Sequence, residues 1–161
     1  MIEARTKSVE DTRALAAGLA PLARPGDIIV LAGDLGTGKT AFTQGFARGL
    51  GVIEPVTSPA FVLARSYEGR LPLTHLDVYR LDHLQELVDI GIAEMLDEGG
   101  VTVVEWGDVV TPVLPADFLE VGLALGEADD DRLVTIRSVG PSWPPRADDL
   151  RRAVGRWAVA G

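Results

Sequence analysis

One stretch of eight residues has the types and the spacing needed to bind a nucleoside phosphate. It reads Gly33-Asp34-Leu35-Gly36-Thr37-Gly38-Lys39-Thr40. Every fixed position of the phosphate-binding pattern G-x-x-x-x-G-K-[ST] is matched. Glycines in this pattern let consecutive backbone N–H groups turn toward one anion. The lysine reaches the β- and γ-phosphates, and the threonine hydroxyl binds a magnesium ion. We therefore predict a nucleotide-binding site that extends from Gly33 to Ala41.

The residues on either side of this loop predict the strand and the helix that it requires. Residues 27–32 form an apolar run typical of a buried strand, and residues 39–50 carry apolar side chains at helical spacing. A helix that begins at the loop adds its unpaired N–H groups and its dipole to phosphate binding. Of the 15 Lys and Arg residues, only Lys7 and Lys39 are lysines, which indicates that the loop needs a compact ammonium group.

Two acidic residues are candidates for holding the magnesium ion and positioning water. Glu105 ends a short β-branched run that predicts a buried strand, and this strand should end at the same sheet edge as the loop. Asp77 lies in an alternating segment that places it on one face with His75 and Tyr79; we interpret His75 itself as structural. Mg²⁺ prefers oxygen ligands and retains water. The predicted metal ligands are Thr40, Asp77 and Glu105, and the predicted catalytic residues are Lys39, Asp77 and Glu105.

The order of the predicted elements indicates an α/β fold. Helical patterns cover residues 8–22, 81–95 and 144–157, and antiparallel hairpins are predicted at residues 61–77 and 118–139. Ser8 begins a capping box for the first helix, and the last helix is predicted to expose a basic face that includes Arg146. We expect a P-loop NTPase-type three-layer domain with a mixed, largely parallel central sheet, formed by residues 1–161 as a single P-loop ATPase domain.

Composition excludes several classes of protein. With 47% hydrophobic and 24% charged residues, the chain is typical of globular proteins. No apolar run approaches the length of about 18 residues that spans a membrane, and no signal peptide opens the chain, so we expect a cytoplasmic protein. Cysteine is absent, which excludes disulfides and thiolate sites. The net charge of −9 argues against direct binding of nucleic acid by this chain. Asparagine is also absent, so a guanine-reading Asn-Lys-x-Asp element cannot exist and ATP is the favoured nucleotide.

Four motifs in series resemble those of the bacterial TsaE (YjeE) family, the small ATPases of tRNA threonylcarbamoyladenosine biosynthesis. They are the phosphate loop, Thr57-Ser-Pro-Ala-Phe61, His75-Leu-Asp-Val-Tyr-Arg80 and Glu105-Trp106. The resemblance covers roughly residues 8–107. It implies a P-loop α/β fold, slow Mg²⁺-dependent ATP hydrolysis and partnership with a two-subunit tRNA threonylcarbamoyltransferase complex. The tRNA would be contacted only indirectly, through that complex, and no membrane is involved.

The resemblance also implies roles for single residues. By position, Lys39 contacts phosphates, Thr40 binds Mg²⁺, and Asp77 and Glu105 form the acidic pair. Trp106 belongs to an edge that faces the partner or the nucleotide, and residues 58–61 form a switch-like loop. One position departs from the family pattern, since Ala60 stands where a threonine is usual. A methyl group cannot bind metal or orient water, so either that hydroxyl is dispensable or Thr57 or Ser58 replaces it. Rough alignment makes residues 6–8 and Arg132 candidates for the adenine pocket.

Two other functions are compatible with a phosphate loop on a short chain. A small-molecule kinase generally needs an arginine-rich lid over the transferred phosphoryl group, but residues 81–100 contain neither Arg nor Lys. A non-catalytic nucleotide-sensing scaffold would bind ATP and ADP without hydrolysis. The presence of both Asp77 and Glu105 argues against this scaffold.

Overall fold

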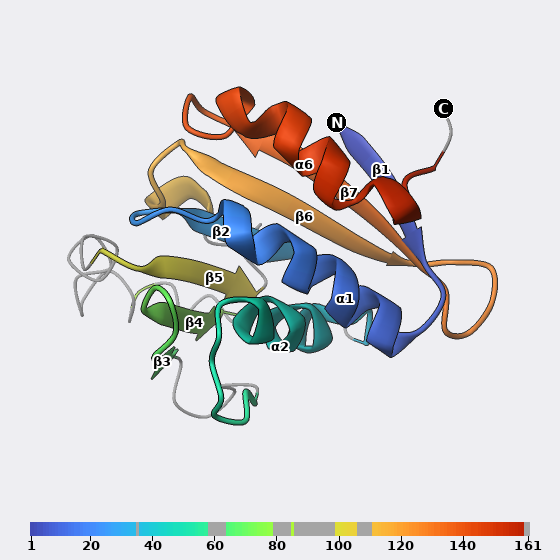
Figure 1. Ribbon diagram of the computed structural model, residues 1–161, viewed down its shortest axis with the longest axis horizontal. Coiled ribbons are helices and arrows are strands. Elements are labelled where there is room, and N and C mark those ends of the chain that lie inside the picture. Colours follow the sequence, from blue (N-terminus) through green and yellow to red (C-terminus); the bar gives the residue numbers. More distant parts are fainter. Residues whose placement is uncertain (35, 58–63, 79–84, 86–98, 106–110, 160–161) are drawn as a thin grey trace.

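The computed structural model describes residues 1–34, 36–57, 64–78, 85, 99–105 and 111–159 (Figure 1). These residues form a seven-stranded sheet in the order β1-β7-β6-β2-β5-β4-β3. Its strands are β1 (Ile2–Thr6), β2 (Ile28–Ala32), β3 (Ala64–Tyr67), β4 (Leu73–Asp77), β5 (Val101–Glu105), β6 (Phe118–Leu125) and β7 (Arg132–Val139). The central neighbours β6–β2, β2–β5 and β5–β4 are parallel, whereas the β1–β7, β6–β7 and β3–β4 pairs are antiparallel. The predicted α/β fold with a mixed sheet and both predicted hairpins is confirmed.

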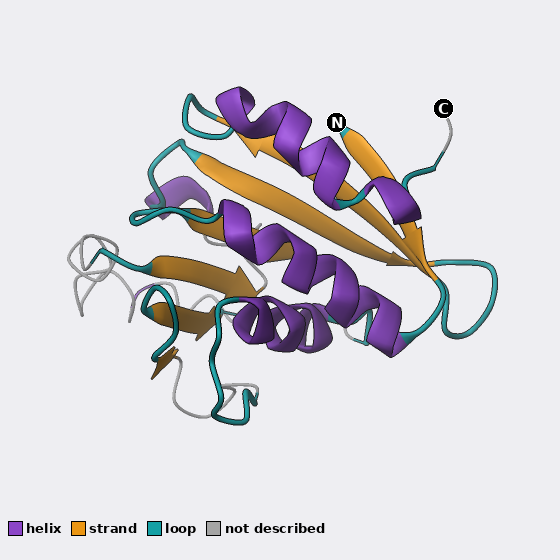
Figure 2. Ribbon diagram, in the orientation of Figure 1, coloured by secondary structure: helices purple, strands orange, loops and turns teal. Residues whose placement is uncertain are grey.

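Helices cover one face of this sheet (Figure 2). The described helices are α1 (Val9–Leu19), α2 (Lys39–Gly49) and α6 (Ala147–Ala153), with short 3₁₀ turns η1 (Ala20–Leu22), η2 (Thr111–Val113), η3 (Pro144–Arg146) and η4 (Gly155–Trp157). The predicted cap of the first helix is confirmed, because the side chain of Ser8 accepts a hydrogen bond from the Asp11 backbone N–H at 3.0 Å. Helices α1 and α2 lie side by side in front of β2 and β5 (Figure 1).

Alternation along the strands divides the buried side chains between two clusters, one on each face. Ile29 and Leu31 of β2 point toward α1 and α2, where they join the larger cluster with Phe42 and Phe46 of α2. On the opposite face, Val30 belongs to a second buried cluster. Its other buried members are Ile28, Leu76, Val78, Val104, Leu114 and Phe118. The helix predicted over residues 81–95 falls almost entirely outside the described residues.

The C-terminal segment differs from its prediction in two ways. The single helix predicted over residues 144–157 is α6 with the 3₁₀ turns η3 and η4 on either side, and one arginine is not exposed. Arg146 was expected on a solvated basic face, but only 3% of it is exposed. Its guanidinium donates to both carboxylate oxygens of Asp27, at 2.6 and 2.9 Å, and stacks 3.8 Å from the Trp143 ring. Asp27 also accepts from the backbone N–H of Arg24 at 2.7 Å. The prediction for Arg146 was wrong because its partner lies 119 residues earlier, which no local helical pattern can indicate.

Candidate functional site

The predicted phosphate loop joins β2 to the N-terminus of α2, as its pattern requires. Leu35 lies outside the described residues. Gly38 is the N-cap of α2 and has φ of +104°, a left-handed conformation that a side chain would strain. Gly33 has a different constraint, because a Cβ at this position would lie 2.4 Å from the carbonyl oxygen of Leu123 in β6. Both glycines are therefore dictated by the geometry of the loop.

Two basic side chains hold the carbonyl groups of this loop. The Lys39 ammonium donates to the carbonyl oxygens of Gly33 and Asp34 at 2.6 and 2.9 Å. Arg132, the first residue of β7, donates from Nε to the Thr37 carbonyl at 3.1 Å and from Nη2 to the Gly36 carbonyl at 3.3 Å. These bonds tie the loop to the first turn of α2 and to the start of β7.

Arg132 contacts the phosphate loop directly, a contact that rough alignment did not suggest. Its place in the adenine pocket stays a prediction. Additional bonds from Nη1 to the carbonyls of Asp129 and Asp131, at 2.7 and 2.8 Å, hold the guanidinium in place. The register of the sheet pairs Arg132 with Thr6 of β1, so the two candidates for the adenine pocket do lie together beside the loop.

Glu105 connects the first turn of α2 to the sheet. Its Oε1 accepts a hydrogen bond from the Thr40 hydroxyl at 3.2 Å, and its Oε2 is bonded to Nε2 of His75. Glu105 is 3% exposed and His75 is fully buried. The three side chains come from β5, α2 and β4, and the order of these elements in space brings them to one edge of the sheet. The predicted proximity of Thr40 and Glu105 is confirmed.

Asp77 ends β4 beside Glu105. The parallel register pairs Asp77 with Glu105 and His75 with Val103. His75 and Asp77 share a face of β4, as the alternation predicts, and that face also carries Leu73, which belongs to the core under α1 and α2. Asp77 is 6% exposed. Both predicted acids therefore lie at the carboxyl ends of adjacent parallel strands, where α/β sheets bind their ligands.

The chemistry of these side chains fits a magnesium ion that is shared with a nucleotide. Mg²⁺ is commonly bound by one or two carboxylates together with phosphate oxygens and water, and less often by a cage made entirely of protein ligands. A threonine hydroxyl and a carboxylate 3.2 Å apart supply such a partial ligand set.

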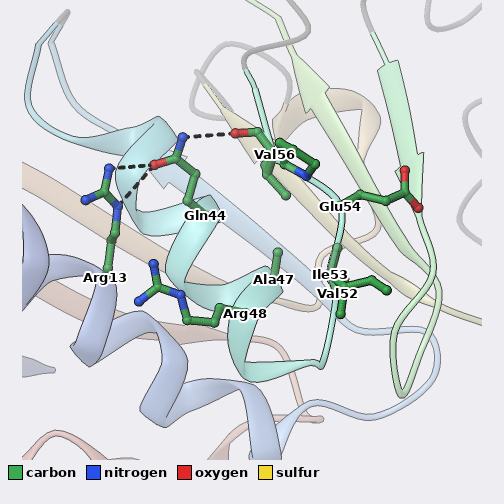
Figure 3. A pocket seen from close by; sticks show the side chains of 9 residues that line it. Arg13, Gln44, Ala47, Arg48, Val52, Ile53, Glu54 and Val56 are labelled. Atoms are coloured by element: carbon green, nitrogen blue, oxygen red, sulfur yellow. Dashed lines mark hydrogen bonds between the residues drawn. The ribbon is translucent and has the colours of Figure 1, made fainter.

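Some predicted features cannot be placed. Residues 58–61 of the switch-like loop, Tyr79, Arg80 and Trp106 lie outside the described residues. The chain before that loop is held, however, because Gln44 of α2 donates to the Val56 carbonyl at 2.9 Å and accepts from Nε and Nη2 of Arg13 at 3.1 and 2.9 Å. Figure 3 shows these bonds at the rim of a cavity of about 470 Å³. Its lining residues are Arg13, Gln44, Ala47, Arg48, Val52, Ile53, Glu54, Pro55 and Val56, and thus come from α1, α2 and the segment after α2.

Comparisons with known proteins agree with this geometry. Residues 6–134 match the family model described as threonylcarbamoyl adenosine biosynthesis protein TsaE. The tRNA threonylcarbamoyladenosine biosynthesis protein TsaE of Bacillus subtilis is 41% identical over 149 residues, which cover 92% of each chain. The protein of the same name from Treponema pallidum is 41% identical over 81% of this chain and 96% of its own. A crystal structure of Bacillus subtilis YdiB superposes with a TM-score of 0.78 at 37% identity and covers 97% of both chains.

Proposed function

Because the chain belongs to the family of threonylcarbamoyl adenosine biosynthesis proteins TsaE, we propose that it is an ATP-binding, slowly ATP-hydrolysing subunit. It would support a two-subunit tRNA threonylcarbamoyltransferase complex during threonylcarbamoyladenosine modification. The observation that carries the proposal is the contact between the Thr40 hydroxyl and the Glu105 carboxylate at the start of the phosphate-loop helix. A fold that served only as a scaffold would not need to bury an acid beside this hydroxyl.

Nucleotide binding would use the groups of the loop that carry a full or a partial positive charge. The backbone N–H groups of residues 36–41 and the Lys39 ammonium would bind the phosphates, and the α2 dipole favours the same negative charge. Lys39 now binds two loop carbonyls, so it would exchange those neutral acceptors for phosphate oxygens. Charge-assisted bonds to an anion are roughly twice as strong as neutral ones, which favours that exchange.

The acidic residues would serve the metal and the attacking water. Thr40 and Glu105 would hold Mg²⁺ with the nucleotide phosphates, and Asp77 would bind it directly or through a water. The bound ion neutralises charge on the phosphates during hydrolysis. Burial keeps Glu105 and Asp77 from bulk water, and the contacts of Glu105 with Thr40 and His75 fix where its oxygens lie, so that Glu105 could orient water without reorganisation.

A partner would complete the site. We propose that docking uses the edge at Glu105 and Trp106 together with the hairpin formed by residues 61–77, because Asp77 at the end of this hairpin pairs with Glu105, which contacts Thr40 of the phosphate loop. The net charge of −9 suits a chain that leaves tRNA binding to the transferase. The described part of the chain has no helix that is long and apolar enough to cross a membrane, which is compatible with the cytoplasmic location that we propose.

The deciding experiment compares ATP hydrolysis by the isolated protein and by the protein with the transferase pair. We expect very slow turnover alone and stimulation in the assembly, because transition-state charge supplied by another subunit is worth about 10³–10⁵-fold in related nucleotide hydrolases. Equal rates in both conditions would contradict partner dependence. Transfer of phosphate to a small acceptor without any partner would instead identify a kinase.

A further inference from the structure

We infer that His75 is a positioning residue that holds the Glu105 carboxylate in the orientation needed beside Thr40. The inference rests on the proposed Mg²⁺–nucleotide site and adds a residue that sequence patterns had assigned to structure alone. His75 itself would touch neither the nucleotide nor the metal, and would act through Glu105.

The Glu105 carboxylate has two oxygens, and each is bound by a different element. Oε2 is bonded to Nε2 of His75 on β4, whereas Oε1 accepts from the Thr40 hydroxyl on α2. If the bond to His75 were lost, the carboxylate could rotate about its terminal torsion, which is broad and has no sharp minimum. Bound at Oε2, the carboxylate keeps its other oxygen directed at the first turn of the phosphate-loop helix.

The position of His75 in the sheet explains why it can do this. His75 lies opposite Val103, two residues before the level of Glu105 and Asp77. It therefore contacts Glu105 from the interior of the sheet. The other oxygen of the carboxylate is left to face α2 and the phosphate loop. His75 is fully buried, so its bond to Glu105 is shielded from water.

The ring has a further feature that packing alone does not explain. In the described residues its Nδ1 is buried and makes no hydrogen bond. Leaving a buried polar atom without a bond costs free energy, whereas an apolar residue of similar size would avoid that cost. Donation from Nε2 to a carboxylate is the one polar contact described for the ring, which points to this bond as the reason for a histidine here. Groups that hydrogen-bond to a metal-binding side chain fix its orientation.

The test uses two amide substitutions that differ in reach. The glutamine in His75→Gln places an N–H donor close to the position of Nε2, and the shorter side chain in His75→Asn cannot do so. Val103→Ala is the matched structural control, because Val103 is buried directly opposite His75. For each folded variant, the affinity for the non-hydrolysable ATP analogue AMP-PNP is measured by calorimetry in EDTA and in Mg²⁺, and thermal unfolding is recorded.

We expect the affinity in EDTA to be similar in all variants. The gain in affinity caused by Mg²⁺ should fall by roughly 10–100-fold in His75→Asn, which is the usual effect of losing a residue that orients a metal-binding side chain. This gain should be retained in His75→Gln. Val103→Ala should unfold at lower temperature with an unchanged Mg²⁺ effect. A wild-type Mg²⁺ effect in His75→Asn, or an equal loss in folded His75→Gln, would overturn the inference. If Mg²⁺ does not change the affinity of the unmodified protein for AMP-PNP, the proposed Mg²⁺–nucleotide site is itself contradicted, and the role of His75 is contradicted with it.

Discussion

Lys39 and Glu105 are charged side chains with little exposed surface, 6% and 3% respectively. Burial of a charge is costly unless other groups bind it. Lys39 binds two loop carbonyls, and Glu105 binds Thr40 and His75. Each buried charge thus has polar partners that offset the cost of its burial.

Removal of the ammonium tests the phosphate-binding role of Lys39. We expect Lys39→Ala to weaken ATP binding by roughly 1.5–3 kcal/mol, the range for hydrogen bonds to charged groups. Calorimetric titration with ATP measures this change. Arg151→Ala is the control for loss of one positive charge, because Arg151 is exposed on α6 and pairs only with the exposed Asp148 in the described residues. Unchanged affinity in Lys39→Ala would contradict the assignment of the loop.

Neutralisation of Glu105 separates nucleotide binding from hydrolysis. In Glu105→Gln the shape of the side chain is kept, so ATP should still bind, while hydrolysis in the full assembly should fall by roughly 10²–10⁴-fold. Glu120→Gln is the control, since Glu120 is also a strand acid but pairs with Arg137 on the sheet surface at 2.9 Å. A normal rate in Glu105→Gln would mean that the acid only ends its strand.

At the scale of elements, the position of α2 sets the position of the phosphate loop, and α1 sets the position of α2. The two helices approach closely at Gly45 and Gly49. A Cβ at Gly45 would lie 2.1 Å from the Arg13 carbonyl oxygen, and one at Gly49 would lie 2.6 Å from that of Ala17. The pair is spaced four residues apart and therefore faces the same neighbour. Helix packing at this contact depends on the absence of side chains.

Addition of one methyl group at this contact should move α2. We expect Gly45→Ala to destabilise the fold by about 1–3 kcal/mol, as overpacking commonly does, and to weaken ATP binding because the loop moves with the helix. Gly18→Ala in α1 is the matched control. Its nearest contact would be the Ala153 carbonyl oxygen at 3.4 Å, and alanine is the better helix former. Denaturant unfolding compares both variants. Equal effects would contradict this account of the packing.

A second link between elements joins the start of α1 to the C-terminal segment and depends on pH. The indole N–H of Trp157 donates to Oδ1 of Asp11 at 3.0 Å, and the Lys7 backbone N–H donates to Oδ2 at 3.1 Å. These bonds, the indole bond first, lower the pKa of Asp11 below its ordinary value of 3.8. The stabilisation of the folded state by the charged Asp11 is therefore complete above the pKa that Asp11 has in the unfolded chain. It is lost as pH falls through the lower pKa that Asp11 has in the folded protein.

Substitution of Asp11 should reveal this dependence. Asparagine can still accept a bond from Trp157 but carries no charge. We expect the difference in unfolding free energy between the unmodified protein and Asp11→Asn to be constant near neutral pH and to shrink as pH falls below about 4. Chemical denaturation over a series of pH values measures it. A difference that is unaffected by acid would mean that the charge of Asp11 contributes nothing to this link.

For the whole molecule, one sheet connects the nucleotide site to both ends of the described chain. β1 lies at one edge, where residues near the C-terminus cover it through a bridge between Ala4 and Ala158 and a bond from the Val159 N–H to the Glu3 carbonyl. Pairing of this kind blocks association through an open strand edge. β3, a strand of four residues, forms the opposite edge and belongs to the proposed docking hairpin.

The net charge of −9 leads to a prediction for assembly. An acidic chain that docks on a basic partner surface should bind it less tightly as ionic strength rises, because salt screens charge pairs across an interface. Association with the transferase pair, measured by light scattering or calorimetry at increasing NaCl, should weaken steadily. Trp106→Ala should weaken it further at every salt concentration. Association that is insensitive to both changes would place the interface elsewhere.

Sequence patterns alone determined several elements and the phosphate loop. The glycines and Lys39-Thr40 predicted the loop, Ser8 predicted the start of α1, and two runs on either side of the acidic turn at residues 129–131 predicted the hairpin of β6 and β7. These signals are local: dihedral preferences, caps and periodicity act over a few residues. The resemblance to the TsaE family, confirmed by the comparisons, rested on motifs of the same kind.

Only the tertiary structure decided which distant side chains meet. His75 and Glu105 are 30 residues apart, and Arg132 is 95 from the loop residue Thr37. The strand order that places β5 between β2 and β4 brings Glu105 and His75 together, and β6 and β7 on the other side of β2 bring Arg132 to the loop. No periodicity within one element encodes that order. For this reason the sequence left His75 as a structural residue, while its position below Glu105 indicates a role in orienting the site.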